Sequence, residues 1–312
     1  MMKLHLAPLQ GYADHIYLKH HSRIYGGLDE LYTPFIRVEK NEPRRQDMTR
    51  LQCAAAYGID ITPQIIFGSA EEFRILTESL KNGGCTRIDL NLGCPYPMQT
   101  GRGRGAAMVG RPEEMERIAA MIRTDNEVAY SVKMRLGMTN PGEWRGVLPV
   151  LNSIPLRHIA VHPRVAKQMY GGTIAYDEFA HIAEASLNKV IYNGDVLTPD
   201  DIDRCVADFP DIAGVMVGRG VLARPSLGAE WHRREPWSRA QRMQHLMRFH
   251  EAVFEEYAAT LCGQVQILQK IKPFWDYLEQ EIGHRHHKAI KKCNTLDKYR
   301  RLISEIGETF QP

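Results

Sequence analysis

Short β-rich runs alternate with helix-like stretches over about the first 220 residues, and this alternation limits the possible folds more than any other feature. The runs are rich in aliphatic and aromatic residues and are bounded by Gly, Pro, Asn or Asp, as strands are. Between them, Pro112 followed by two acids marks one helix start, and Thr198 is suited to cap another. The predicted strands cover residues 3–8, 31–38, 61–68, 86–93, 128–137, 158–164, 189–196 and 214–220.

Eight strand–helix pairs predict an α/β fold, either a (β/α)8 TIM barrel or a doubly wound open sheet. The G-x-G-x-x-G pattern that opens many dinucleotide-binding sheets does not follow the first strand. We therefore predict the barrel and keep the open sheet as the alternative.

The alternation stops after Pro225, and from about residue 238 the sequence has only helical patterns. This change predicts a barrel domain over residues 1–232 and a smaller all-helical domain over residues 233–312. Residues 231–312 hold 14 Lys and Arg against 10 Asp and Glu, whereas the first 230 residues hold 26 against 27. The positive excess of the helical part is consistent with a polyanionic partner.

The sequence indicates a cytoplasmic protein. No run approaches the ~18 apolar residues that a membrane span needs, and the N-terminal apolar stretch is too short for a secretory signal. The six cysteines are far apart and form no C-x-x-C pair, so neither a disulfide framework nor a structural zinc site is expected. We also expect a monomer.

Polar side chains alternate with apolar ones near the ends of five predicted strands. Asp89 and Asn91 share one face of their strand, and Ser131, Lys133 and Arg135 share one face of the next. In a barrel these groups would gather at the carboxyl-terminal mouth, where barrel enzymes have their active sites. An unpaired lysine there would require an anionic partner. The other strands contribute Gln64, His162, Arg164 and Asn193.

The last two strands end in sequences suited to phosphate. Gly194 follows the seventh strand, and the segment Gly218-Arg219-Gly220 follows the eighth. Glycines let backbone N–H groups approach phosphate oxygens, and loops seven and eight of a barrel often bind phosphate. A phosphate-bearing cofactor, a lysine near its reactive end and Cys94 beside Asn91 together indicate a flavin mononucleotide (FMN) oxidoreductase.

Motifs along the whole barrel resemble those of the tRNA-dihydrouridine synthases, flavoenzymes that reduce the C5–C6 double bond of uridines in RNA. Two departures from the family pattern are Leu9, where Met is usual, and the altered segment 162–172. The matching motifs are LAPLQGYAD (6–14), PQIIFG (63–68), DLNLGCPYP (89–97), GRGRGAAM (101–108), SVKMRLG (131–137), VHPRVAKQMYGG (161–172), IYNGDV (191–196) and VMVGRGVLARP (215–225).

The resemblance implies a role for individual residues of this chain. The FMN-binding positions it implies are Pro8, Leu9, Gln64, Lys133 and His162, with Asn193, Gly194, Asp195, Gly218 and Arg219 at the phosphate end. Uracil recognition would fall on Asn91, Arg135 and Tyr170, and the catalytic proton donor would be Cys94.

The mechanism implied by the resemblance adds a hydride to C6 of uracil and a proton to C5. A thiol with an ordinary pKa of ~8.5 is mostly protonated at neutral pH, so Cys94 can act as the acid. NADPH, or NADH, would reload the flavin at the same open mouth, because no dinucleotide motif is visible.

The expected partner is tRNA, with one uridine extruded into the barrel mouth. Residues 284–301 hold seven Lys and Arg against one acid, and no Cys or acid completes a metal site with the histidines there. Three alternatives stay open: a uridine of ribosomal RNA, a free pyrimidine, and RNA binding without catalysis. The residues expected to contact the RNA backbone are Arg102, Arg104, Lys288, Lys291 and Lys292.

Overall fold

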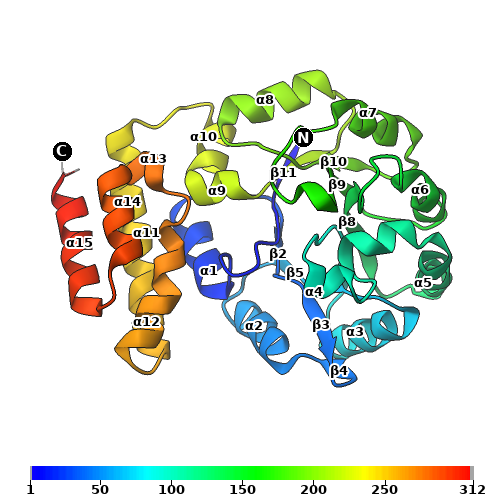
Figure 1. Cartoon of the computed structure of the whole chain (residues 1–312), viewed down its shortest axis with the longest axis horizontal. Helices are drawn as coiled ribbons and strands as arrows, with labels where there is room; N and C mark the ends of the chain where they lie inside the picture. Colours follow the sequence, from blue (N-terminus) through cyan, green and yellow to red (C-terminus); the bar gives the residue numbers. More distant parts are fainter. Residues whose placement is uncertain (1, 310–312) are drawn as a thin grey trace.

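The computed structural model describes residues 2–309 and contains a closed ring of parallel strands surrounded by helices (Figure 1). The ring closes where β1 meets residues 29–30: Leu6 N–H donates to Glu30 O at 2.9 Å, and Asp29 N–H donates to Leu4 O at 2.8 Å. The predicted (β/α)8 barrel is therefore confirmed, and the open sheet is excluded. The strands that follow β1 (Lys3–Leu6) are β2 (Leu31–Tyr32), β3 (Ile36–Glu39), β5 (Ile61–Thr62), β6 (Gln64–Ile66), β7 (Arg87–Leu92), β8 (Ala129–Gly137), β9 (Ile159–Val165), β10 (Val190–Tyr192) and β11 (Gly214–Val217).

Two of the eight predicted strands are interrupted by proline. Pro34 lies between β2 and β3, and Pro63 separates β5 from β6. Proline has no N–H to donate to a ladder, so each strand breaks where it occurs. The halves still pair in parallel, β2 with β5 and β3 with β6, and a short β4 (Glu42–Pro43) extends β3 as an antiparallel hairpin.

Helices follow the strands as the sequence predicts, and their caps are those expected. Thr198 Oγ1 accepts from Asp201 N–H at 3.2 Å, which confirms the predicted cap. The helices around the barrel are α1 (His15–Ile24), α2 (Arg45–Ala56), α3 (Ala70–Asn82), α4 (Pro97–Thr100), η1 (Gly105–Gly110), α5 (Pro112–Thr124), α6 (Trp144–Asn152), η2 (Ala166–Gln168), α7 (Tyr176–Ala185), α8 (Pro199–Asp208), α9 (Arg219–Ala223) and α10 (Leu227–Arg233).

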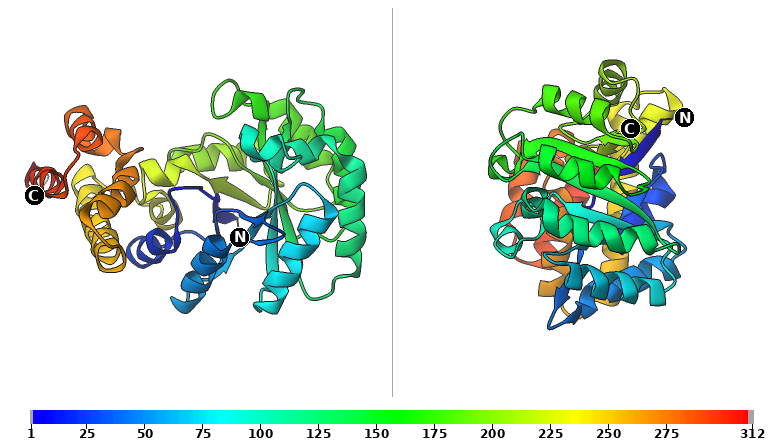
Figure 2. Two further views of the ribbon diagram at one scale, coloured as in Figure 1. Left: turned by 60° about the horizontal axis from the view of Figure 1, so that its bottom comes forward. Right: turned by 90° about the vertical axis from the view of Figure 1, so that its right-hand side faces the viewer.

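The remaining helices form a group beside α1, on one side of the barrel (Figure 2). The hydrophobic core continues from the barrel into this group, where Phe249 packs edge-to-face on Tyr17 with ring centroids 4.9 Å apart. Lys270 Nζ also pairs with Asp14 Oδ2 at 2.6 Å. The helices are α11 (Arg239–Thr260), α12 (Gln264–Ile271), η3 (Lys272–Trp275), α13 (Glu279–Ile282), α14 (His284–Lys292) and α15 (Leu296–Thr309). Among the described residues, no helix is long and apolar enough to cross a membrane.

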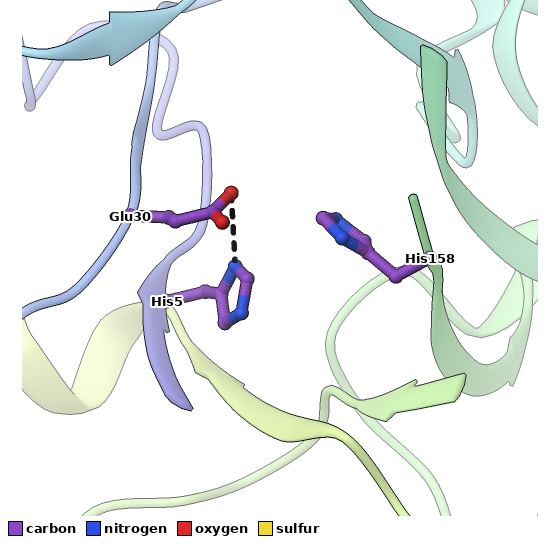
Figure 3. A group of neighbouring side chains, drawn as sticks. All are labelled: His5, Glu30 and His158. Carbon is purple, nitrogen blue, oxygen red and sulfur yellow. Dashed lines mark ion pairs between the residues drawn. The ribbon is translucent and has the colours of Figure 1, made fainter. Parts of the chain in front are cut away.

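The amino-terminal end of the barrel interior is polar. His5, Glu30 and His158 point toward one another there, with one potential ligand atom from each lying within 4.8 Å of the others (Figure 3). The Tyr32 hydroxyl occupies the space between them, 2.9 Å from His5 Nδ1, 3.1 Å from Glu30 Oε2 and 3.0 Å from His158 Nε2. Arg157 also donates to Glu30 at 2.6 Å. The cluster is therefore bridged by a phenol and balanced by a cation.

Candidate active site

One pocket opens at the carboxyl-terminal mouth of the barrel. It is lined by residues from the loops after β1, β7, β9, β10 and β11 and by inward-facing residues of β8. The mouth is where a TIM barrel places its functional groups. The predicted site residues on its wall are Pro8, Leu9, Asn91, Cys94, Lys133, Arg135, His162, Tyr170, Asn193, Gly194, Asp195, Gly218 and Arg219.

Asn91 fixes the loop that carries Cys94. Its Oδ1 accepts from the backbone N–H groups of Gly93 at 3.0 Å and Cys94 at 2.8 Å, and its Nδ2 donates to Gln64 Oε1 at 2.7 Å. The side chain therefore joins the barrel interior to the cysteine loop. Contact with uracil stays a prediction for Asn91, whereas this supporting role was not predicted.

Cys94 lies in the pocket wall with only 7% of its surface exposed. Burial raises the pKa of its thiol, although the Tyr96 backbone, Arg135 and Lys133 act in the opposite direction. The sulfur is therefore held as a neutral thiol at neutral pH, the form that can give up a proton.

The glycine-rich segment after Cys94 supports the cysteine from behind. Ala106 N–H donates to Cys94 O at 3.1 Å. Gly105 has φ +61°, and a Cβ on it would lie 2.7 Å from Cys94 O and 2.8 Å from Cys94 Cβ. Only glycine combines this conformation with this close approach.

Three basic side chains, those of Lys133, Arg135 and His162, project from β8 and β9 into the pocket. Burial lowers the pKa of Lys133 to about 8, with Arg135 as a second cause. Lys133 Nζ has no hydrogen-bond or ion-pair partner within residues 2–309. Arg135 is 2% exposed and donates to Val165 O at 3.1 Å, while burial keeps the pKa of His162 well below its usual value. The pocket is therefore electropositive and suited to an anion.

Tyr170 lies between two arginines at the mouth. The guanidinium carbons of Arg135 and Arg219 are 5.4 Å and 5.2 Å from the centroid of its ring. Burial, with the Tyr96 hydroxyl beside it, raises the pKa of Tyr170 to about 12. The ring is thus a neutral, polarised surface on one side of the pocket.

The loops after β10 and β11 meet on the Arg219 side of the Tyr170 ring. Asp195 accepts from Arg219 at 2.9 Å and from Arg164 at 2.5 Å and 2.9 Å, so two guanidinium groups share one carboxylate. A Cβ on Gly220 would lie 2.1 Å from Val196 O, so the backbones of the two loops meet where no larger residue fits. This side combines excess positive charge with close backbone packing, the chemistry that phosphate requires.

One predicted contact is wrong, and a second predicted residue lies beneath the pocket. Arg104 is 3% exposed; its Nε donates to Glu72 Oε2 at 2.9 Å and its Nη2 reaches Glu72 Oε1 and Val38 O, so it is not available to an RNA phosphate. Gln64 is fully buried beneath the pocket, where it donates to Asp89 Oδ2 at 2.7 Å and accepts from Asn91. The geometry shows a supporting role for Gln64, and its contact with a cofactor stays a prediction.

The other predicted RNA contacts are exposed. Arg102 lines a separate groove with Met98 and Lys40, whereas Lys288, Lys291 and Lys292 lie on α14. Lys291 Nζ is 3.9 Å from Asp276 Oδ1. Their contact with RNA stays a prediction.

Aromatic residues that were not predicted complete the pocket. Tyr12 and Tyr277 meet edge-to-face with ring centroids 5.4 Å apart, and the Tyr12 hydroxyl donates to Asp276 at 3.2 Å. The helical group therefore contributes Tyr277 to the mouth. Tyr12 and Tyr96 lie inside recognisable motifs and could have been found from them, but no sequence signal marks Tyr277.

Comparison with known proteins identifies one family to which this chain is similar. The family profile described as Dihydrouridine synthase (Dus) matches residues 5–309. A tRNA-dihydrouridine(16) synthase of Cupriavidus necator is 33% identical over 238 residues, covering 73% of this chain and 72% of the relative. The tRNA-dihydrouridine synthase B of Vibrio vulnificus is 24% identical over 311 residues, covering 97% of this chain and 91% of the relative.

Solved structures share the barrel at low sequence identity. A variant of NCR from Zymomonas mobilis has a TM-score of 0.50 at 13% identity and covers 76% of this chain and 88% of its own. TcOYE, solved with pHBA, has a TM-score of 0.51 at 10% identity and covers 76% of this chain and 90% of its own. These similarities concern the fold alone.

Proposed function

The chain belongs to the dihydrouridine synthase family, and from this premise we propose that it reduces uridine in tRNA to 5,6-dihydrouridine. The observation that carries the proposal is the buried Cys94 thiol, which faces a pocket containing an unpartnered lysine. A proton donor and an anion-binding group in one cleft are the parts that reduction of a C=C bond conjugated to a carbonyl requires.

We propose FMN as the cofactor, and the residues present fit it. Lys133 is an ammonium that requires an anion, and the loops after β10 and β11 supply positive charge and close backbone packing for a phosphate. The residues that would hold it are Pro8, Leu9, Lys133, His162, Asn193, Gly194, Asp195, Gly218 and Arg219. When bound, the flavin supplies the hydride, and NADPH is the proposed reductant.

The chain's own residues supply the proton and hold the base. Cys94 donates its thiol proton to C5 of uracil, and the raised pKa keeps that proton on sulfur until it is needed. Asn91 keeps the backbone of Cys94 in place through its two accepted hydrogen bonds. Arg135, fixed by Val165 O, faces the pocket as the cation for the carbonyl oxygen on which charge develops.

We propose that residues 1–232 form the catalytic domain and residues 233–312 the RNA-recognition domain. The exposed lysines of α14 supply positive charge for a phosphate backbone. Tyr277 gives the helical group a place in the wall of the pocket, so an RNA bound by that group lies next to the catalytic cysteine. The target position and the choice of RNA are decided by how that group orients the substrate.

The proposal is tested by deleting the gene and mapping dihydrouridine across the tRNA and ribosomal RNA of the cell. Loss from one tRNA position supports the proposal, and position 16 is examined first because of the Cupriavidus necator relative. Loss from ribosomal RNA alone, or activity on free uracil alone, contradicts it in favour of the corresponding alternative.

A companion test uses the purified protein and its Cys94→Ala variant. We expect both to bind FMN, with its absorbance near ~450 nm, and the variant to lose most dihydrouridine formation. A colourless wild-type protein that cannot take up FMN, or a fully active variant, contradicts the mechanism.

A further inference from the structure

Several of the large apolar side chains exposed in residues 2–309 lie at the catalytic mouth or next to it. Tyr96 is 48% exposed, Tyr170 44% and Leu197 49%, and all three line the active-site pocket. Met98, at 73%, follows two residues after Tyr96. Exposed apolar surface beside a site marks a place where a ligand is covered or bound.

The backbone of Tyr96 is held in place, and its ring is exposed. The carbonyl oxygen of Tyr96 accepts from Gln99 N–H at 2.8 Å and from Thr100 N–H at 3.0 Å, which fixes it at the start of α4. No aromatic ring or guanidinium within residues 2–309 stacks on its ring. An aromatic ring on a fixed backbone is therefore free to stack, and no backbone ordering is lost when a ligand covers it.

A groove lies beside the same segment, and its four cationic side chains outnumber its two carboxylates. Met98 and Arg102 line it together with Lys40, which lies at the turn between β3 and β4. Neither Arg102 nor Lys40 makes an ion pair with a carboxylate of the described chain, whereas the Arg104 guanidinium beneath them is neutralised by Glu72. The backbone of Arg102 is also fixed, since a Cβ on Gly68 would lie 2.3 Å from its carbonyl oxygen. An aromatic face followed by unpaired cations matches the base and phosphate of one nucleotide.

We propose that Tyr96, Met98 and Arg102 bind the nucleotide next to the extruded uridine, with its base stacked on Tyr96 and Met98 and its phosphate paired with Arg102. This inference rests on the proposed function, because it takes the RNA substrate from there. Extruding one uridine leaves the neighbouring base without a stacking partner on one side. A stacking surface two residues from the catalytic cysteine restores that contact and fixes the distance between the RNA backbone and the pocket.

The first test compares Tyr96→Ala and Tyr96→Phe with wild-type holoenzyme. We expect Tyr96→Ala to lower kcat/KM for tRNA about tenfold to a hundredfold, the effect of losing one base stack, while Tyr96→Phe stays within about twofold. Flavin absorbance and flavin reduction by NADPH without RNA are expected to be unchanged. Leu187→Ala is the matched control, because Leu187 is 82% exposed and lies at the other end of the barrel, before β10.

The second test identifies the occupant by removing the base on one side of the target uridine. A tRNA that is abasic at the neighbouring position should react with the wild type about as poorly as intact tRNA reacts with Tyr96→Ala, and the two changes together should cause no further loss. Arg102→Gln should lower the slope of log Kd against log salt by about one.

The outcomes separate this inference from the proposed function. A wild type that forms no dihydrouridine on any RNA contradicts the proposed function. Unchanged tRNA affinity and kcat/KM in Tyr96→Ala, independent effects of the variant and the abasic site, or a Tyr96→Phe loss as large as that of Tyr96→Ala overturns the stacking proposal. A change of oligomeric state in Tyr96→Ala with unaltered RNA kinetics assigns the surface to a second copy of the chain and overturns it as well.

Discussion

Replacing Gly105 by alanine should disable catalysis more than it destabilises the fold. Gly105 lies behind the loop of Cys94, and a Cβ added to it would approach Cys94 O to 2.7 Å and Cys94 Cβ to 2.8 Å. Carbon atoms in contact prefer a separation of about 3.5–4.0 Å. The methyl group therefore lacks roughly 0.7 Å of space, and the neighbouring atoms are backbone and Cβ, which cannot rotate away.

The contacts around Gly105 set the expected losses of folding stability and of kcat. At φ +61° alanine costs about 1–2 kcal/mol in backbone energy, and overpacking adds about 1–3 kcal/mol. Relief of the clash moves Cys94 toward the pocket by a large fraction of an ångström. Because a misplacement of about 1 Å can cost on the order of a hundredfold in rate, we expect kcat to fall roughly tenfold to a hundredfold.

The assay measures dihydrouridine formation on tRNA together with the free energy of unfolding from urea titration. Gly84→Ala is the matched control, because Gly84 has φ +82° and no atom within 4 Å of its added Cβ. The control should lose about 1–2 kcal/mol of stability and keep its kcat. If Gly105→Ala kept the kcat of the control, the close support of Cys94 would have no catalytic consequence, and the reasoning would be refuted.

Two further changes test the charges inside the barrel. Lys133→Met should weaken FMN binding about tenfold to a hundredfold. In fluorescence titrations, the FMN affinity of the wild type should fall as the pH rises above about 8, because the unliganded ammonium loses its proton there, whereas the affinity of the variant should not change with pH. Equal pH profiles would contradict the anion-binding role. Burial lowers the pKa of His5 to about 4, so the unfolded chain binds more protons than the folded chain between pH 6.5 and 4, and the free energy of unfolding falls as the pH is lowered. In urea titrations, His5→Gln should lose about 2 kcal/mol less of this free energy than the wild type between pH 7 and pH 5. An equal loss would contradict burial of a neutral imidazole.

The sequence was sufficient to predict all eight barrel strands because hydrophobic runs and turn residues are local signals. It was insufficient where a single residue interrupts a run. The predicted strands 31–38 and 61–68 are each divided in the structure, at Pro34 and Pro63, although both prolines are visible in the sequence. In these two strands the halves pair separately, β2 with β5 and β3 with β6, and that pairing is not a local property.

The site could be predicted as a set of residues but not as a set of contacts. Arg104 was expected to bind RNA because, like Arg102, it was predicted to lie near the active mouth. Its actual partner is Glu72, on the neighbouring helix α3, and nothing in either segment announces the pair. Two arginines separated by one residue thus have opposite environments, one buried and neutralised and the other exposed and unpaired.

Height within the barrel explains why alternating polar residues differ in role. Gln64 pairs in register with Asp89, and Asp89 pairs with Ser131, so these three side chains form one buried layer, in which burial raises the pKa of Asp89 to about 6. Residues two positions further along a strand lie about 6.6 Å higher.

Asn91 and Lys133, paired in register, therefore form the next layer up, and Arg135 with His162 lies above them at the mouth. The upper layers face the pocket, while the lower layer holds Asn91 through Gln64, and Asn91 in turn holds Cys94. A period of two shows that a residue points into the barrel, but only the strand register shows whether it can reach a ligand. The placement of Gln64 required that register, since in sequence it is indistinguishable from the polar residues that line the pocket.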